Sequence, residues 1–125
     1  MVARLFIIAV LFCSCASTRT VQTSLYFGQS KLDGSIVTNN EWNQFVETHI
    51  SKVFPDGCTI AETHGNWYDT AQHKIIAEPS KVVTAIFKYS STQARQIDSL
   101  RYWYKQLYQQ QSVLRVDYTV KAKLF

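Results

Sequence analysis

The chain has few of the residues that interrupt or cross-link a fold. Among its 125 residues are only four Gly, two Pro and three Cys. The scarcity of Gly and Pro excludes collagen-like and low-complexity chains, and a hydrophobic content of 46% excludes an intrinsically disordered one. The net charge of +4 is modest. Three cysteines are an odd number, so at least one thiol lies outside any disulfide.

A hydrophobic run long enough to cross a membrane is also missing. The apolar run near the N-terminus, residues 5–12, follows Arg4. At about 1.5 Å per helical residue it spans roughly 12 Å, against a hydrocarbon core of roughly 30 Å. The run is therefore typical of a signal peptide rather than of a transmembrane anchor.

The small residues after this run predict a site of lipid attachment. Phe12-Cys13-Ser14-Cys15 resembles a bacterial lipobox, in which the last cysteine is acylated, although Phe12 stands where that box usually has Leu. We expect a signal peptide over residues 1–14, a lipid-modified tether over 15–22 and a single domain over 23–125. The alternative is an ordinary secretory signal that is cleaved after Ala16.

Both cleavage routes leave Cys58 as the only free thiol, so neither allows an intramolecular disulfide. Acyl chains on Cys15 would hold the domain to the lipid bilayer without help from basic residues. The sequence thus predicts a protein of the bacterial cell envelope that is exported and anchored by lipid. In a Gram-negative cell this would be the outer membrane.

Hydrophobic periodicity predicts alternating strands and helices after the tether. Thr38 and Glu41 form a capping box before a helix, and the final strand alternates with Leu114, Val116 and Tyr118 pointing inward. Pro79 removes a hydrogen-bond donor and predicts a sheet edge or a bulge. The expected strands span 23–28, 58–64, 75–88 and 113–124, and the expected helices span 39–54 and 92–110.

The order β-α-β-β-α-β predicts a ferredoxin-like α+β sandwich, a four-stranded antiparallel sheet with two helices on one face. The other face then lacks a cover. Residues 82–87 are largely apolar at consecutive positions, so both sides of that strand favour burial. Three arrangements stay open: a homodimer that pairs two sheets, a fold-back of residues 65–80, or a solvated face.

Segment 64–81 holds the best candidates for contact with a ligand or partner. Trp67 and Tyr68 offer aromatic surface, His73 and Glu78 offer titratable groups, and Lys81 offers a cation. We expect residues 65–69 to form a hairpin or loop with residues 70–74 as its tip. Glu78 and Lys81 point to opposite faces if the strand is regular.

Other chemistries have little support in the sequence. Cys58, His64, His73 and His49 are spaced too widely for a typical zinc site. A Cys58–His64 nucleophile pair has no nucleophile elbow beside it. The RNP-type aromatic run of an RNA-binding sheet is missing, so we expect no nucleic-acid partner. We predict no metal, no cofactor and no catalytic residue.

Several short motifs together resemble an uncharacterised bacterial family of short exported proteins, many of them lipoprotein-like. They are Leu25-Tyr26-Phe27-Gly28, Phe54-Pro55-Asp56-Gly57 and Ser112-Val113-Leu114-Arg115. The resemblance implies export and one domain, and implies no activity. The overall hypothesis is a membrane-tethered, non-catalytic binding or interaction module. The alternative is a small ligand-binding protein or enzyme with a pocket at the interface of a dimeric α+β barrel.

Overall fold

A computed structural model describes residues 19–123 of the chain. Within this range one four-stranded sheet has the order β2-β3-β1-β4. All its strand pairs are antiparallel. The strands are β1 (Thr20–Gly28), β2 (Thr59–Asp69), β3 (Lys74–Lys88) and β4 (Leu114–Thr119), and the helices are α1 (Asn39–Phe45), η1 (Val46–Ile50), α2 (Ser51–Val53) and α3 (Ser91–Tyr108).

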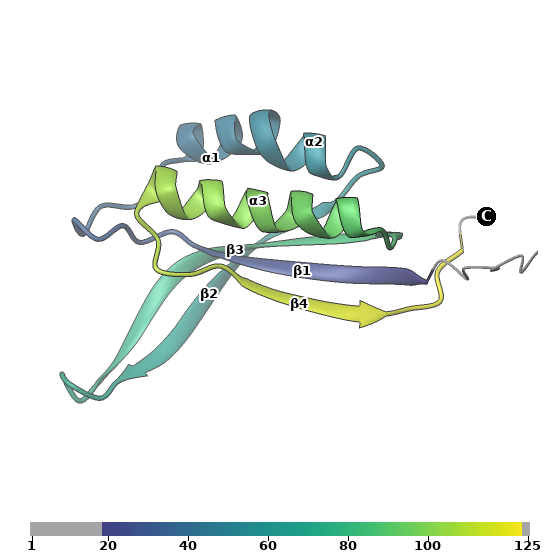
Figure 1. Ribbon diagram of the computed structural model, residues 1–125. Coiled ribbons are helices and arrows are strands. Elements are labelled where there is room, and N and C mark those ends of the chain that lie inside the picture. The colour runs from purple at the N-terminus through teal and green to yellow at the C-terminus, as the bar shows by residue number, and fades with distance from the viewer. Residues whose placement is uncertain (1–18, 124–125) are drawn as a thin grey trace, which may run out of the picture.

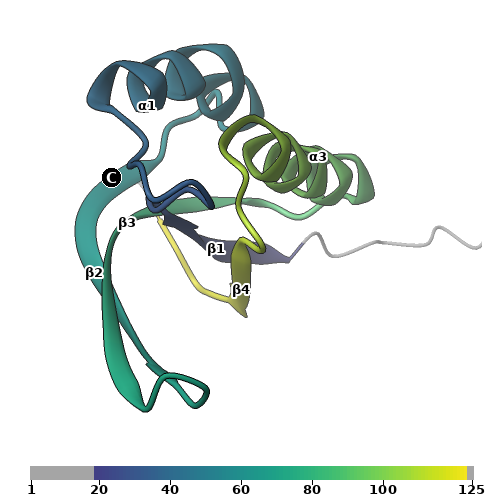
Figure 2. The same ribbon diagram turned by 90° about the vertical axis from the view of Figure 1, so that its left-hand side faces the viewer.

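The helices all lie on one side of the sheet, as Figures 1 and 2 show from two directions. The first helical layer is the continuous run of α1, η1 and α2, and the second is α3. The predicted ferredoxin-like α+β fold is therefore confirmed. Among the described residues no helix combines the length and apolar character needed to cross a membrane.

Aromatic rings fill the space between the helices and the sheet. Phe27 of β1 packs edge-on against Trp42 of α1 and Tyr104 of α3, with ring centroids 5.5 and 4.7 Å apart. Tyr104 is fully buried. The other buried core residues are Leu25, Val37, Phe45, Ile50, Phe54, Val83, Ala85, Ile97, Leu100, Tyr108 and Val113. Val21 is buried as well, so the buried hydrophobic residues of the described part of the chain lie between positions 21 and 113.

The predicted first helix begins where its capping box places it. The Thr38 side chain accepts a hydrogen bond from the Glu41 backbone N–H, and the Glu41 carboxylate accepts one from the Thr38 N–H. The helix is not a uniform α-helix, however. Its middle, η1, is a π-helix, in which the Ser51 N–H donates to the Val46 carbonyl. This turn brings Ile50, five positions after Phe45, to the buried side of the helix.

The hairpin of β2 and β3 is longer than predicted. Trp67 and Tyr68 lie within β2, which continues to Asp69, so of the two alternatives for residues 65–69 the hairpin is confirmed and the loop is wrong. The register is continuous from Thr59↔Thr84 to Asp69↔Lys74, with no bulge. Cross-strand pairing keeps these residues extended although the Gly65-Asn66 pair is typical of a loop.

Pro79 lies where the expected edge occurs. Its carbonyl accepts a hydrogen bond from the Gln29 N–H at 2.9 Å, just beyond the Gly28↔Ser80 pair that ends the β1–β3 ladder. On an antiparallel strand the nitrogen and the carbonyl of one residue point to the same neighbour. The nitrogen of Pro79 therefore points past the end of β1, where no ladder donor is required.

The predicted orientation of the last strand is wrong. Leu114 and Tyr118 point away from the helices and are 59% and 60% exposed. Arg115 points toward α3, where its guanidinium bonds the Asp98 carboxylate at 3.2 Å. β4 is the edge strand of the sheet, and the group that Arg115 contacts on the helix side is the Asp98 carboxylate of α3 rather than the hydrophobic core.

Candidate interaction surface

The side of the sheet opposite the helices carries a row of exposed apolar side chains. Residues paired across antiparallel strands share one face, so the registers Tyr26↔Val82, Tyr26↔Leu114 and Ser24↔Val116 define this side. We call it the open face. Its large exposed members are Tyr26 (41%), Ile86 (47%), Leu114 (59%), Tyr118 (60%) and, further along β2, Trp67 (51%).

The centre of the open face has no charged side chain. Its polar members are hydroxyl and amide groups, and two pairs of hydroxyls satisfy one another: Ser24 with Thr84 at 3.2 Å, and Thr63 with Ser80 at 2.7 Å. Along β3 the nearest charges on this side are Glu78 at one end and Lys88 at the other. Depletion of charge at the centre is typical of the core of a protein interface.

The outer half of the β2–β3 hairpin projects beyond the rest of the sheet. We call this part, residues 65–78, the arm. Figures 1 and 2 show that it curves away from the helices, toward the side of the open face. Trp67 pairs with Ile76 on the side that continues the open face, whereas Tyr68 pairs with Ile75 on the outer side. The arm thus makes the open face concave and adds an indole ring to it.

Lys81 lies on the helix side of β3, remote from the open face. Its ammonium bonds the Glu62 carboxylate at 2.8 Å and lies 5.6 Å from the centre of the Trp42 ring. The Lys81 side chain is only 11% exposed, while that of Glu62 is 82% exposed. The hydrogen bond and the charge of Lys81 lower the pKa of Glu62. These partners give Lys81 a structural role.

Glu78 lies on the open-face side, between two glycines. It pairs with Gly65 on β2. A Cβ added at Gly28 would lie 3.1 Å from the Glu78 carboxylate and 3.0 Å from the Gln110 side-chain oxygen. The missing side chain at Gly28 therefore leaves room for both groups. Within residues 19–123 the Glu78 carboxylate forms no ion pair.

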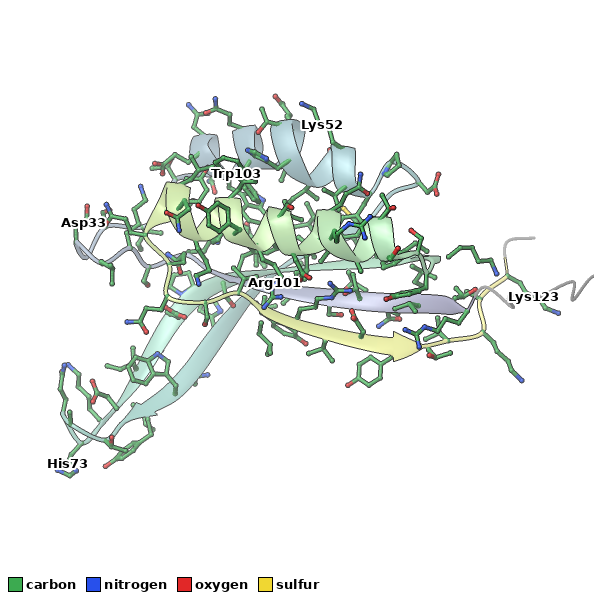
Figure 3. All side chains as sticks on the ribbon, viewed as in Figure 1. Asp33, Lys52, His73, Arg101, Trp103 and Lys123 are labelled. Atoms are coloured by element: carbon green, nitrogen blue, oxygen red, sulfur yellow. The ribbon has the colours of Figure 1, made fainter. Side chains whose placement is uncertain are left out.

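The structure does not bring the five predicted contact residues together. Trp67 and Glu78 share the concave side, Tyr68 faces outward, and Lys81 packs under α1. His73 occupies the tip of the arm, as Figure 3 shows. Its backbone is left-handed, with φ 50°. Trp67, Tyr68 and Glu78 therefore do not line one pocket within a single chain.

The residues weighed for chemistry are also dispersed. No group of three or more His, Cys, Asp or Glu side chains in residues 19–123 is placed to hold a metal ion. Burial raises the pKa of the Cys58 thiol, which packs against the core as a small hydrophobe. Burial, and secondarily the charge of Lys52, lowers the pKa of His49, whose ring lies 4.9 Å from that of Phe45.

The open-face residues Tyr26, Leu114 and Tyr118 were missed as candidate contacts. The period-two pattern of residues 113–124 marked an apolar side, and that side was assigned to the core. The charged Arg115 and Asp117 at the alternate positions favour that assignment, so the strand alone holds no signal against it. The partner of Arg115 on the helix side, the Asp98 carboxylate, is identified only by the structure.

Comparison with known proteins supports the fold. Two structures of a phage SAM lyase share it: the complex with S-methyl-5'-thioadenosine has a TM-score of 0.63 at 12% identity, with 80% of this chain and 81% of that chain covered. The apo form has a TM-score of 0.59 at 14% identity, and the match covers 88% of this chain and 95% of that chain. CutA from Synechococcus elongatus has a TM-score of 0.51 at 12% identity, and the match covers 83% of this chain and 79% of that chain. Identities this low establish the fold alone.

No curated protein matches the chain. Residues 22–124 match the family described as "Protein of unknown function (DUF3574)", and the chain belongs to this family.

Proposed function

We propose that this member of a family of unknown function is a lipid-tethered domain of the bacterial envelope that acts by binding, with a second copy of itself as the partner. The tether is an acylated Cys15, which lies outside the described residues. The contact surface is the open face together with the concave side of the arm. The observation that carries the proposal is the uncharged apolar centre of that face.

The exposed apolar area of the open face matches the requirement of a stable dimer. Three of the five large side chains are aromatic, and an aromatic side chain buries about 150–250 Å² in a core. With the smaller Ile86 and Leu114 added, five side chains that are each about half exposed present roughly 400–500 Å². A standard interface buries about 800 Å² per partner, of which about 65% is apolar in homodimers. A patch of about 400–500 Å² lies in the range of the largest apolar patch on a typical monomer, and such patches are often functional.

Charge selects one orientation of the two copies. Glu78 and Lys88 lie ten positions apart on β3, both on the open-face side, at opposite ends of the uncharged centre. A two-fold axis in the plane of the interface and perpendicular to the strands places each Glu78 opposite the partner's Lys88 end. The parallel alternative opposes like charges, which costs energy. The proposed dimer is therefore antiparallel along β3.

The position of the tether is compatible with this contact. β1 begins at Thr20, at the end of the sheet opposite the arm, as Figure 1 shows. A lipid anchor on the segment before β1 would hold that end near the bilayer. The arm and the open face would then remain accessible to a second copy.

The pairing is tested by sedimentation equilibrium of the chain from Ala16 onward, which retains all the buried hydrophobic residues of the described part. We expect a concentration-dependent dimer. Tyr26→Lys places a charge at the centre of the face and is expected to weaken the dimer at least tenfold. Leu107→Lys is the matched control, because Leu107 is 52% exposed on α3 and lies outside the face. A wild-type monomer at millimolar concentration, or equal weakening by both variants, would refute the pairing.

The tether is tested separately in cells. Cys15→Ala is expected to abolish metabolic labelling with radioactive palmitate and to release the protein from the membrane fraction. Cys13→Ala is the control, because that residue is expected to leave with the signal peptide. Labelling that persists in the Cys15 variant would show that this attachment site is wrong, whatever the outcome for the dimer.

A further inference from the structure

A groove runs between the two helical layers, on the side of the molecule opposite the open face. Its volume is about 310 Å³. Thr48, His49 and Lys52 line it from η1 and α2, and Arg95 and Trp103 line it from α3. Lys52 and Trp103 are labelled in Figure 3, on the two layers that border the groove. The groove is thus built from two elements distant in the sequence.

Positive charge predominates in this groove. Lys52 and Arg95 approach it from opposite sides, and its lining contains no Asp or Glu. Neither cation has an ion-pair partner within residues 19–123. The Arg95 guanidinium donates to the Thr92 hydroxyl at 3.2 Å, which leaves most of its donors unused. The first turns of α3 add the partial positive charge of a helix N-terminus.

The rest of the lining is aromatic and apolar. The Trp103 side chain is 49% exposed, and its ring lies nearly parallel to that of His49, with centroids 6.4 Å apart. Val53 and the buried Leu100 complete the apolar part of the lining. His49 sits on the π-helical turn, and such turns are frequent at functional sites. Because its pKa is lowered, His49 presents a neutral ring at pH 7.

From these observations we infer that the groove between η1–α2 and α3 binds a small organic anion, a phosphate or carboxylate joined to a planar ring. Arg95 and Lys52 receive the anionic group, since guanidinium and ammonium donors form charge-assisted hydrogen bonds with phosphate and carboxylate oxygens. The ring packs on the exposed indole of Trp103. The volume equals roughly ten water molecules, which is the size of a single ring with one anionic group. The inference does not depend on the proposed dimer, because the groove lies on the other side of the sheet.

The test uses phenyl phosphate as the probe and two-dimensional NMR of the isotopically labelled chain from Ala16 onward. We expect chemical-shift changes centred on the Trp103 indole and on residues 92–103. Arg95→Gln and Lys52→Gln are each expected to weaken binding about fivefold or more at low salt. Lys105→Gln is the matched control, because it removes the same charge from α3 outside the groove, and it should leave the affinity unchanged.

Two further probes test the demand for a ring. Inorganic phosphate and hexyl phosphate should bind at least tenfold more weakly than phenyl phosphate, and Trp103→Leu should remove this difference. The ring assignment is overturned if hexyl phosphate binds as well as phenyl phosphate. The site itself is overturned if phenyl phosphate produces no localised shifts at about 20 mM, or if Lys105→Gln weakens binding as much as Arg95→Gln.

Discussion

The hydroxyl of Tyr104 is the polar group on which the core depends most directly. It donates to the Gly28 carbonyl at 2.8 Å and accepts from the Gln29 side-chain amide at 2.8 Å. Its ring is fully buried among other aromatic rings. Tyr104→Phe keeps the ring packing and removes both hydrogen bonds. At about 0.5–1.5 kcal/mol for each bond, the free energy of unfolding should fall by about 1–3 kcal/mol at pH 8.

The effect of Tyr104→Phe on the free energy of unfolding should depend on pH. Burial is the main cause that raises the pKa of Tyr104 above its ordinary value of 10.0. Below pH 10 both the folded and the unfolded chain keep the proton, so the contribution to stability is complete. Above pH 10 the unfolded chain loses the proton first, and the wild-type protein is destabilised by about 1.4 kcal/mol per pH unit. The Tyr104→Phe variant does not show this destabilisation, because it has no hydroxyl to ionise at position 104.

The gap in stability between the two proteins should therefore shrink by about 1.4 kcal/mol between pH 8 and pH 11. Urea denaturation followed by circular dichroism at pH 8, 10 and 11 measures it. Tyr108 has a raised pKa as well, but it is present in both proteins and cancels in the difference. A gap that is constant with pH would refute the reasoning, because it would mean that Tyr104 ionises as readily in the fold as in the unfolded chain.

Two further predictions concern the turns that delimit the first helix. Thr38→Ala removes the cap from α1 and should lower the free energy of unfolding, measured by urea denaturation, by about 0.5–2 kcal/mol. A loss smaller than the error of the measurement would contradict the role of the capping box. Gly57→Ala forces a side chain onto a backbone with φ of 109° and should lower the free energy of unfolding by about 1 kcal/mol or more. Asp56→Ala is the control, because Asp56 is exposed and its backbone has no positive φ. Equal losses in the two variants would contradict the argument.

Much of the fold was predictable from the sequence because its signals are local. The box formed by Thr38 and Glu41 marks the start of α1, and the alternation of Leu25 and Phe27 marks the buried side of β1. The π-helical turn at η1 was not predicted, although the buried Phe45 and Ile50 are five positions apart, a spacing that would place them about 140° apart around a continuous α-helix.

The candidate surface was predicted only in part. Trp67 and Glu78 were identified from residue type, and both lie on the concave side. Lys81 was chosen as an accessible cation, yet it is buried beside Trp42 and paired with Glu62. A single sequence specifies that positions 78 and 81 lie on opposite faces of a strand. It does not specify which of those faces the helices cover.

The sequence by itself determined the order of the elements, the ferredoxin-like sheet and the expectation of a lipid tether at Cys15. Each depends on spacing along the chain: capping residues, period-two alternation and the length of an apolar run. The tertiary structure decided which apolar side chains remain exposed. Leu114 and Tyr118 alternate as regularly as a core strand, but the register with β1 pairs Arg115 with the buried Leu25 and Leu114 with Tyr26 of the open face. Pairing between residues distant in the sequence thus fixes which side of the edge strand faces the helices, and no periodicity within that strand records it.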